Sequence, residues 1–194
     1  MTVIIHSIIT RWRDSGVICK SEEDIYEYGL ELILFSILNL VAILLTALFL
    51  GKFLESVLLI ITIIPLQMLG GGYHAKTHLR CFLVMYIGWW AIIFLIPLIS
   101  PLIALIVNCV SVTIVFLLAP IPHVNIKMSA RQRYRLRKLV RIIVFTFSVF
   151  GSALTRSDSI GLSVGIVIST GIGVAALSML IAYISNKHVM LEQS

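Results

Sequence analysis

The sequence contains little charge, and acidic residues are its scarcest charged class. Of the 194 residues, 9 are Asp or Glu and 15 are Lys or Arg, and no acidic residue occurs between Glu55 and Asp158. A soluble domain carries about 25% charged residues, whereas this chain has 12%, with 59% hydrophobic residues and a mean hydropathy of +1.06. This composition excludes a water-soluble domain and indicates that lipid surrounds most of the chain.

Cysteine is also scarce. Cys19, Cys81 and Cys109 are too few and too scattered for a disulfide framework, so we expect three free thiols. The apolar run from Val3 to Ile9 is short and contains His6, so we expect no cleaved signal and a retained N-terminus. The net charge of +6 is concentrated in one basic stretch between apolar runs, so it predicts no nucleic-acid partner.

Long apolar runs predict an all-α, polytopic membrane protein with a single domain over residues 1–194. A helix needs about 20 apolar residues to cross the hydrocarbon of a bilayer. We expect about six transmembrane helices, at residues 32–50, 53–69, 82–99, 102–119, 142–154 and 160–184. The fifth of these segments is short for a full crossing, and the sixth is long enough to tilt.

The distribution of positive charge predicts the orientation. With six spans, both termini lie on one side, which carries 13 of the 15 Lys and Arg residues, and the opposite side carries only Lys52 and Arg156. Loops rich in Lys and Arg stay in the cytoplasm. We therefore expect cytoplasmic termini, a cytoplasmic segment at residues 70–80 and a basic cytoplasmic loop at residues 120–141.

Residues 1–28 are expected to form an amphipathic helix before the first span. Apolar residues recur there at helical spacing, at Ile5, Ile8, Ile9 and Trp12. This helix either lies in the membrane interface or packs on the protein. Ser21 to Asp24 form a capping box with an acidic first turn, so a second helix is expected to start there and to continue into the first span.

A polar, glycine-rich segment separates the second span from the third. It reads GGGYHAKTHLRC from Gly70 to Cys81. Irregular backbone at membrane depth needs partners for its amide groups, so the segment either lines a protein cavity or is a flexible cytoplasmic turn. If the part after the glycines is helical, His74, His78 and Cys81 share one face.

A histidine and a cysteine together are the components of a cysteine protease dyad. The thiolate is the nucleophile, and an imidazole, the cations Lys76 and Arg80 and a helix N-terminus all favour it. On a straight helix His74 is about 10.5 Å from Cys81 along the axis, so spacing alone slightly favours His78 as the base. The other arrangement has the helix begin after His74, so that the glycine segment folds His74 over the thiol.

A zinc site is the competing interpretation of these residues. The His-x-x-x-His pattern has Ala75 where a zinc protease places its catalytic Glu, and no acidic residue lies nearby to act as a base. We therefore expect neither a metal nor another cofactor. A third catalytic residue would have to supply an amide or a hydroxyl, for example from Gln67, Asn108, Ser111 or Thr113.

The segment from Gly71-Gly72-Tyr73-His74 to Cys81 resembles the signature of the AgrB family, the membrane cysteine endopeptidases of bacterial quorum sensing. The chain length, the span count and the basic loop after the fourth span are also similar, so the resemblance covers essentially the whole chain. It implies a bacterial cell membrane protein whose active site is on the cytoplasmic side. It also implies His74 and Cys81 as the catalytic pair, with accessory roles for His78, Gly71, Gly72, Lys76 and Arg80.

The resemblance implies a substrate as well. This is a short AgrD-like propeptide with an amphipathic N-terminal helix, an internal Cys or Ser and an acidic C-terminal tail. Cys81 would release the tail and hold the rest as a thioester, which the internal nucleophile converts to a thiolactone or lactone. The backbone amides near the glycine run or at the start of the third helix are candidate donors to the oxyanion.

A basic run follows the fourth span and has two compatible roles. Its residues are Arg131, Arg133, Arg135, Arg137 and Lys138, and they occupy every face of a helix. Such a run anchors a chain on anionic membrane lipids. It is equally suited to capture of an acidic propeptide tail.

The last span carries small residues at intervals of four, namely Gly161, Gly165, Ser169 and Gly173. Such a ridge allows close helix contact. It predicts either packing within the monomer or a homodimer, which the family resemblance also implies.

Two other classes of function are compatible with the same residues. In a small transporter or peptide exporter, the glycine-rich segment would be a gate and the His/Cys cluster a relay. Such relays generally place Asp or Glu inside the spans, and the four expected spans between residues 82 and 184 contain none. In a non-catalytic scaffold, Cys81 and both histidines would be replaceable.

Overall fold

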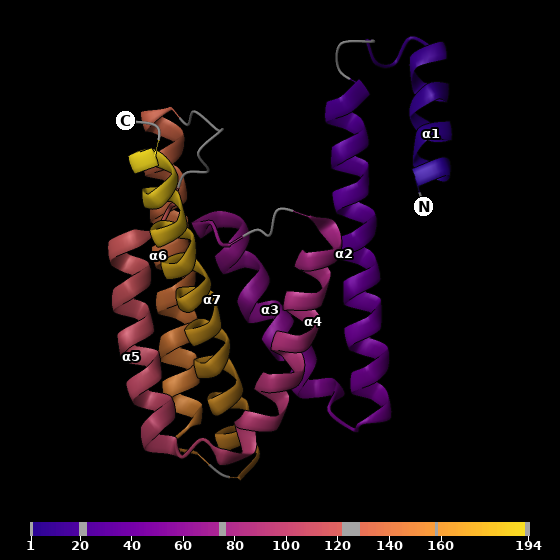
Figure 1. Ribbon diagram of the computed structural model, residues 1–194. Helices are drawn as coiled ribbons and strands as arrows, with labels where there is room; N and C mark the ends of the chain where they lie inside the picture. Colours follow the sequence, from indigo (N-terminus) through magenta and orange to yellow (C-terminus); the bar gives the residue numbers. More distant parts are fainter. Residues whose placement is uncertain (1, 20–22, 74–76, 122–128, 158, 193–194) are drawn as a thin grey trace. The chain divides into compact units, whose positions relative to one another are not determined.

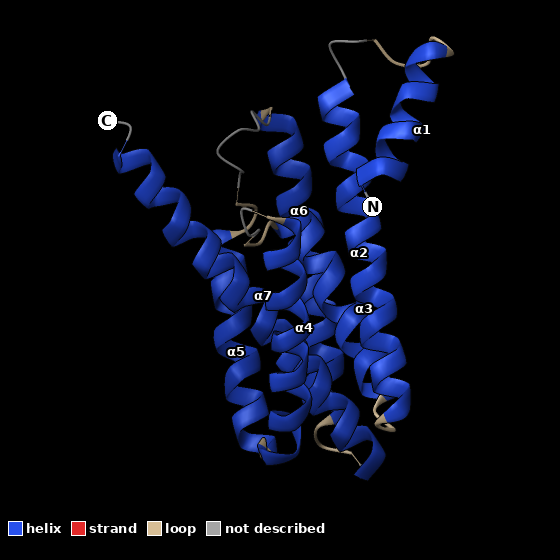
Figure 2. Ribbon diagram, turned by 45° about the vertical axis from the view of Figure 1, so that its right-hand side comes forward, coloured by secondary structure: helices blue, strands red, loops and turns tan. Residues whose placement is uncertain are grey.

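The computed structural model describes all residues except 1, 20–22, 74–76, 122–128, 158 and 193–194. The described residues form helices and no strands (Figure 2), which confirms the all-α class. The helices are α1 Thr2–Asp14, α2 Glu23–Phe49, α3 Phe53–Gly70, α4 His78–Leu95, the 3-10 helix η2 Ile96–Leu98, α5 Pro101–Leu118, α6 Ala130–Leu154 and α7 Ser159–Glu192 (Figure 1).

Five of the described helices are long and apolar enough to cross a membrane. Their apolar segments are Gly29–Phe49, Phe53–Gly70, Leu79–Leu98, Pro101–Leu118 and Ser159–Asn186. They correspond to five of the six expected spans. The remaining one, 142–154, is the second half of α6, and α6 is not among the five because its first half is strongly basic.

Helix α6 begins earlier than the expected loop at 120–141 would allow. Ser129 is its N-cap: the Ser129 side chain accepts a hydrogen bond from the Gln132 amide at 3.2 Å, and Gln132 Oε1 accepts one from the Ser129 amide at 3.0 Å. This reciprocal capping box satisfies two amides at the helix start. The basic residues from Arg131 onward are therefore helical, not part of a loop.

The chain divides into two compact units, and the larger one holds residues 47–74 and 90–194. Helix α7 contacts α3, α5 and α6 there, and Figure 1 shows α5, α6 and α7 side by side. Fully buried residues of α7, such as Ile172 and Met179, pack with Leu66 of α3, Val115 of α5 and Val144 of α6. Helix α7 is thus the central element of this unit.

The small residues of α7 lie at these internal contacts. A Cβ atom added to Gly173 would lie 2.8 Å from Val107 Cγ1 of α5, and one added to Gly165 would lie 2.5 Å from the Thr155 amide nitrogen after α6. Close helix approach requires such residues. Of the two roles predicted for the ridge, the structure shows packing within the monomer.

The smaller unit holds residues 1–46 and 75–89. Ile5 and Ile9 of α1 are buried, and the partly buried Leu30 and Leu34 of α2 pack against their cluster. Helix α1 therefore packs on the protein, one of its two predicted placements. Helix α2 runs without interruption from Glu23 into the first span, as the acidic capping sequence predicts. The Thr46 and Tyr86 hydroxyls, 2.8 Å apart, link α2 to α4.

Candidate functional site

The first four residues of the glycine segment, 70–73, are bound within the larger unit. The Gly71 amide donates to the Gln67 carbonyl of α3 at 3.0 Å, and the Ile121 amide donates to the Gly70 carbonyl at 2.9 Å. Gly71 has φ +80°, a conformation that favours glycine. These contacts contradict a free turn for the first residues of the segment.

Close packing explains why all three positions are glycine. A Cβ atom on Gly70 would overlap the Met179 side chain of α7, and one on Gly71 would lie 2.7 Å from the Ile121 carbonyl oxygen. A Cβ atom on Gly72 would lie 3.0 Å from Ser178 Oγ. The segment is thus seated between the central helix and the chain that follows α5.

Ser178 of α7 binds the backbone of Tyr73, the last residue described before position 74. The Tyr73 amide donates to Ser178 Oγ at 3.0 Å. Tyr73 directly precedes His74, so this bond fixes the backbone at the entry to the predicted base. Ser178 is not among the residues predicted from the sequence. No local pattern indicates it, because its role depends on how α7 packs on a segment 105 residues earlier.

Cys81 lies in the first turn of α4 and is a free, partly exposed thiol. Thr77 caps this helix: the Arg80 amide donates to Thr77 Oγ1 at 3.3 Å, and the Cys81 amide donates to the Thr77 carbonyl at 3.0 Å. Helix α4 therefore begins at His78, after His74. A helix that begins after His74 is one requirement of the arrangement in which the glycine segment folds His74 over the thiol.

The structure describes the predicted nucleophile but not the predicted bases. His74 and Lys76 lie outside the described residues, and so does the side chain of His78, the first residue of α4. Arg80 is described, and it is exposed. The identity of the base therefore stays a prediction.

Three of the four suggested third residues are engaged elsewhere in α5. Asn108 is fully buried, and its side-chain amide contacts the Ser148 carbonyl at 3.2 Å and Ser152 Oγ at 3.1 Å. Ser111 is buried as well, and Thr113 Oγ1 donates to the carbonyl of its own helix at Cys109.

Gln67 is the suggested third residue that lies beside the glycine segment. Its Cγ would be 3.4 Å from a Cβ atom on Gly72. Its own carbonyl accepts the Gly71 amide, so the residue is bonded to this segment through its backbone, and its side chain lies beside Gly72.

Backbone amides near the glycine run and at the start of α4 are the two suggested sources of hydrogen bonds to the oxyanion. The Gly71 and Tyr73 amides are bonded to Gln67 and Ser178. At the start of α4, the amides of His78 and Leu79 have no acceptor within the helix, because the first turn of any helix lacks them. The start of α4 therefore stays a predicted source of oxyanion donors.

The basic residues of α6 separate into two groups. Arg131, Arg133 and Arg135 are exposed. Arg137 and Lys138 are also exposed, and both line a pocket between α6 and the end of α5. The run is therefore not a uniform cationic surface.

Comparison with known proteins gives a single kind of match. The model of the family "Accessory gene regulator B" (AgrB) matches residues 4–186. No curated protein and no solved structure matches the chain.

Proposed function

Because the chain belongs to the AgrB (accessory gene regulator B) family, we propose that it is a membrane cysteine endopeptidase that processes a signal propeptide. Membership of the family supports a role in the agr quorum-sensing system. The observation that carries the proposal is that the family match covers nearly the whole chain, including the segment from Gly70 to Cys81. The position of Cys81 in a capped first helical turn is compatible with it.

Cys81 is the proposed nucleophile. Its thiolate attacks the carbonyl carbon that precedes the acidic tail of the propeptide. A thiolate and an oxyanion are both negative, and the start of a helix favours negative charge. The amides of His78 and Leu79 are the proposed donors to the oxyanion.

His74 is the proposed base. It takes the proton of the Cys81 thiol and delivers it to the amine of the departing tail as the carbon–nitrogen bond breaks. The remaining peptide is then bound to Cys81 as a thioester. The resemblance of the segment from Gly71 to Cys81 to the AgrB signature supports this assignment over His78.

The second step closes a ring. The internal thiol or hydroxyl of the propeptide attacks the thioester carbonyl, loses its proton to the base, and displaces Cys81 as a thiolate. Exchange between two thioesters is nearly isoenergetic, whereas hydrolysis is strongly downhill, so cyclisation requires that water be excluded. The product is a thiolactone or a lactone.

The proposed substrate is a short amphipathic propeptide with an acidic tail. We assign the attraction of this tail to Arg131, Arg133 and Arg135, which are exposed on the first half of α6. A homodimer, which the family implies, needs a surface other than the small-residue ridge, because that ridge packs within the chain.

The test uses the full chain in vesicles and a synthetic propeptide of this class. Wild type and Cys109→Ala release the tail, because Cys109 is an exposed thiol within α5 that has no role in the reaction. Cys81→Ala releases none. Tail release that persists in Cys81→Ala contradicts the proposal, and transport of an unprocessed peptide identifies an exporter instead.

The same assay identifies the base. Loss of a general base lowers a rate by about 10²- to 10⁴-fold. We expect such a loss in His74→Ala and a much smaller one in His78→Ala. The reverse order would assign the base to His78.

A further inference from the structure

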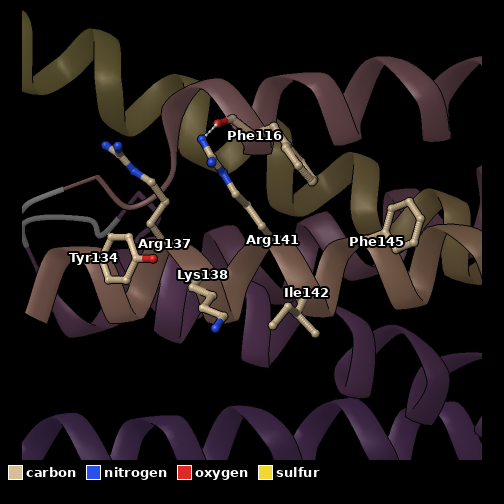
Figure 3. A pocket seen from close by; sticks show the side chains of 7 residues that line it. All are labelled: Phe116, Tyr134, Arg137, Lys138, Arg141, Ile142 and Phe145. Carbon is tan, nitrogen blue, oxygen red and sulfur yellow. Dashed lines mark hydrogen bonds between the residues drawn. The ribbon is translucent and has the colours of Figure 1, made fainter.

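One face of α6 forms a pocket with the end of α5. The pocket has a volume of about 430 Å³ and is shown in Figure 3. Its lining residues are Phe116, Tyr134, Arg137, Lys138, Arg141, Ile142 and Phe145. Six of the seven belong to α6 at spacings of three and four residues, so they form one continuous helical face.

The lining changes character along this face. Arg137 and Lys138 lie near its N-terminal end, and Ile142 and Phe145 lie toward the middle of the helix, as Figure 3 shows. The distance along the axis from position 137 to position 145 is about 12 Å, at 1.5 Å per residue. A phospholipid has the same gradient, from a charged headgroup to an apolar chain, over a similar depth.

Arg141 lies at the boundary between the two parts. Its Nη2 donates to the Phe116 carbonyl at 2.9 Å, and its guanidinium carbon is 5.3 Å from the centre of the Phe116 ring. Its Nε is buried and has no hydrogen-bond partner within the described structure. Its contacts with Phe116 therefore fix this guanidinium to the end of α5, where the cationic and the apolar parts of the lining meet.

We propose that this pocket binds an anionic phospholipid of the cytoplasmic leaflet. The phosphate lies at the cationic end of the pocket, where Arg137 and Lys138 attract it, and an acyl chain lies against Ile142 and Phe145. The apolar half of the lining gives an acyl chain a surface that an acidic peptide tail alone would leave unused. The proposal does not depend on the chemistry of Cys81.

The headgroup site is tested by replacing basic residues inside the pocket and, as a control, basic residues outside it. The full chain, in a neutral detergent, is titrated with phosphatidylglycerol or phosphatidylcholine of equal chain length, and bound lipid is counted by native mass spectrometry. We expect wild type to bind phosphatidylglycerol and to prefer it to phosphatidylcholine. The double variant Arg137→Gln/Lys138→Gln is expected to bind it about 30-fold more weakly, from about 1 kcal/mol for each cation.

The matched control removes the same charge from the same helix. Arg131→Gln/Arg133→Gln lies outside the pocket lining, so its binding of phosphatidylglycerol stays within about twofold of wild type if the pocket is a built site. Equal losses in both double variants would overturn the proposal in favour of a diffuse basic surface. Equal binding of the two lipids would overturn it as well.

Substitution of two phenylalanines of similar exposure tests whether the apolar half of the pocket binds an acyl chain. Phe145 lines the pocket, and Phe150 of the same helix does not. Phe145→Asn is expected to weaken binding of long-chain phosphatidylglycerol, and Phe150→Asn to leave it unchanged. If instead a glutamate-rich peptide binds through Arg137 and Lys138 while lipid binding is the same in all variants, the pocket is a peptide site and the lipid proposal fails.

Discussion

Single hydrogen bonds fix the backbone at two positions close in sequence to the proposed catalytic residues. Ser178 accepts the amide of Tyr73, which precedes His74, and Thr77 accepts the amide of Arg80, which precedes Cys81. Neither Ser178 nor Thr77 is assigned a chemical step. We propose that both act as positioning residues, and their loss is expected to affect turnover more than substrate binding.

Ser178→Ala tests this positioning role. Removing the hydroxyl frees the Tyr73 amide, so we expect kcat for tail release to fall about tenfold while KM changes little. The control is Ser163→Ala, an exposed serine of α7 whose hydroxyl bonds only to the Ser159 carbonyl. Equal kcat values in the two variants would show that the Tyr73 bond does not matter.

Gly71→Ala tests the packing of the glycine segment. The residue has positive φ, and an added Cβ atom would lie 2.7 Å from the Ile121 carbonyl oxygen. We expect a loss of about 1–3 kcal/mol in the free energy of unfolding, measured by helicity during titration with a denaturing detergent.

Gly88→Ala provides the comparison for that variant. Gly88 is in α4, and an added Cβ atom there meets nothing within 4 Å. It should be neutral or slightly stabilising, because alanine favours a helix. If Gly71→Ala is equally neutral, the segment is less constrained than its contacts indicate.

At the scale of the helix, α5, α6 and α7 are joined by one buried polar cluster. The Asn108 side-chain amide lies 3.1 Å from Ser152 Oγ of α6 and 3.4 Å from Ser169 Oγ of α7. Interhelical hydrogen bonds within a membrane contribute about 0.6 kcal/mol each on average. The cluster therefore adds modestly to apolar packing around α7.

Asn108→Ala is expected to lower the free energy of unfolding by about 1–2 kcal/mol, since it removes the interhelical bonds of this side-chain amide and leaves a small cavity. Thr113→Ala is the control on the same helix, because Thr113 is exposed and bonds only within α5. The measurement is the detergent-unfolding midpoint of each variant. Equal midpoints in the two variants would contradict a stabilising role for Asn108.

The elements were more predictable from sequence than the contacts between them. Apolar runs predict most of the long helices, because burial in lipid acts on each segment separately. The start of α6 at Ala130 was missed, although Ser129 and Gln132 form a recognisable capping box. Cys81 is identifiable from its neighbours in sequence, whereas the contacts of Ser178 and Arg141 arise only from tertiary packing.

For the whole molecule, α6 decides the topology. Five helices are apolar enough to cross the membrane, and α6 has a basic first half and an apolar second half. If α6 also crosses, both termini are cytoplasmic and Arg156 lies outside. The positive-inside rule accepts either number of crossings, because Lys52 and Lys187 lie outside with five crossings and Lys52 and Arg156 with six.

A single cysteine at Ser157, in the turn after α6, tests the topology in a chain whose natural cysteines are replaced by alanine. We expect a membrane-impermeant thiol reagent to label it from outside intact cells. The control position is Ser129, at the other end of α6, which should be labelled only after permeabilisation. Labelling of both positions from the same side would show that α6 does not cross.

The most direct test of the account is to trap the covalent intermediate on Cys81. The full chain is mixed with a propeptide whose internal nucleophile is replaced by alanine, quenched in acid, digested and examined by mass spectrometry. We predict that the Cys81 peptide gains the mass of the propeptide without its tail, and that hydroxylamine removes the added mass, as it does for a thioester. Tail release without any adduct on Cys81, or an adduct on Cys19 or Cys109, would contradict the account.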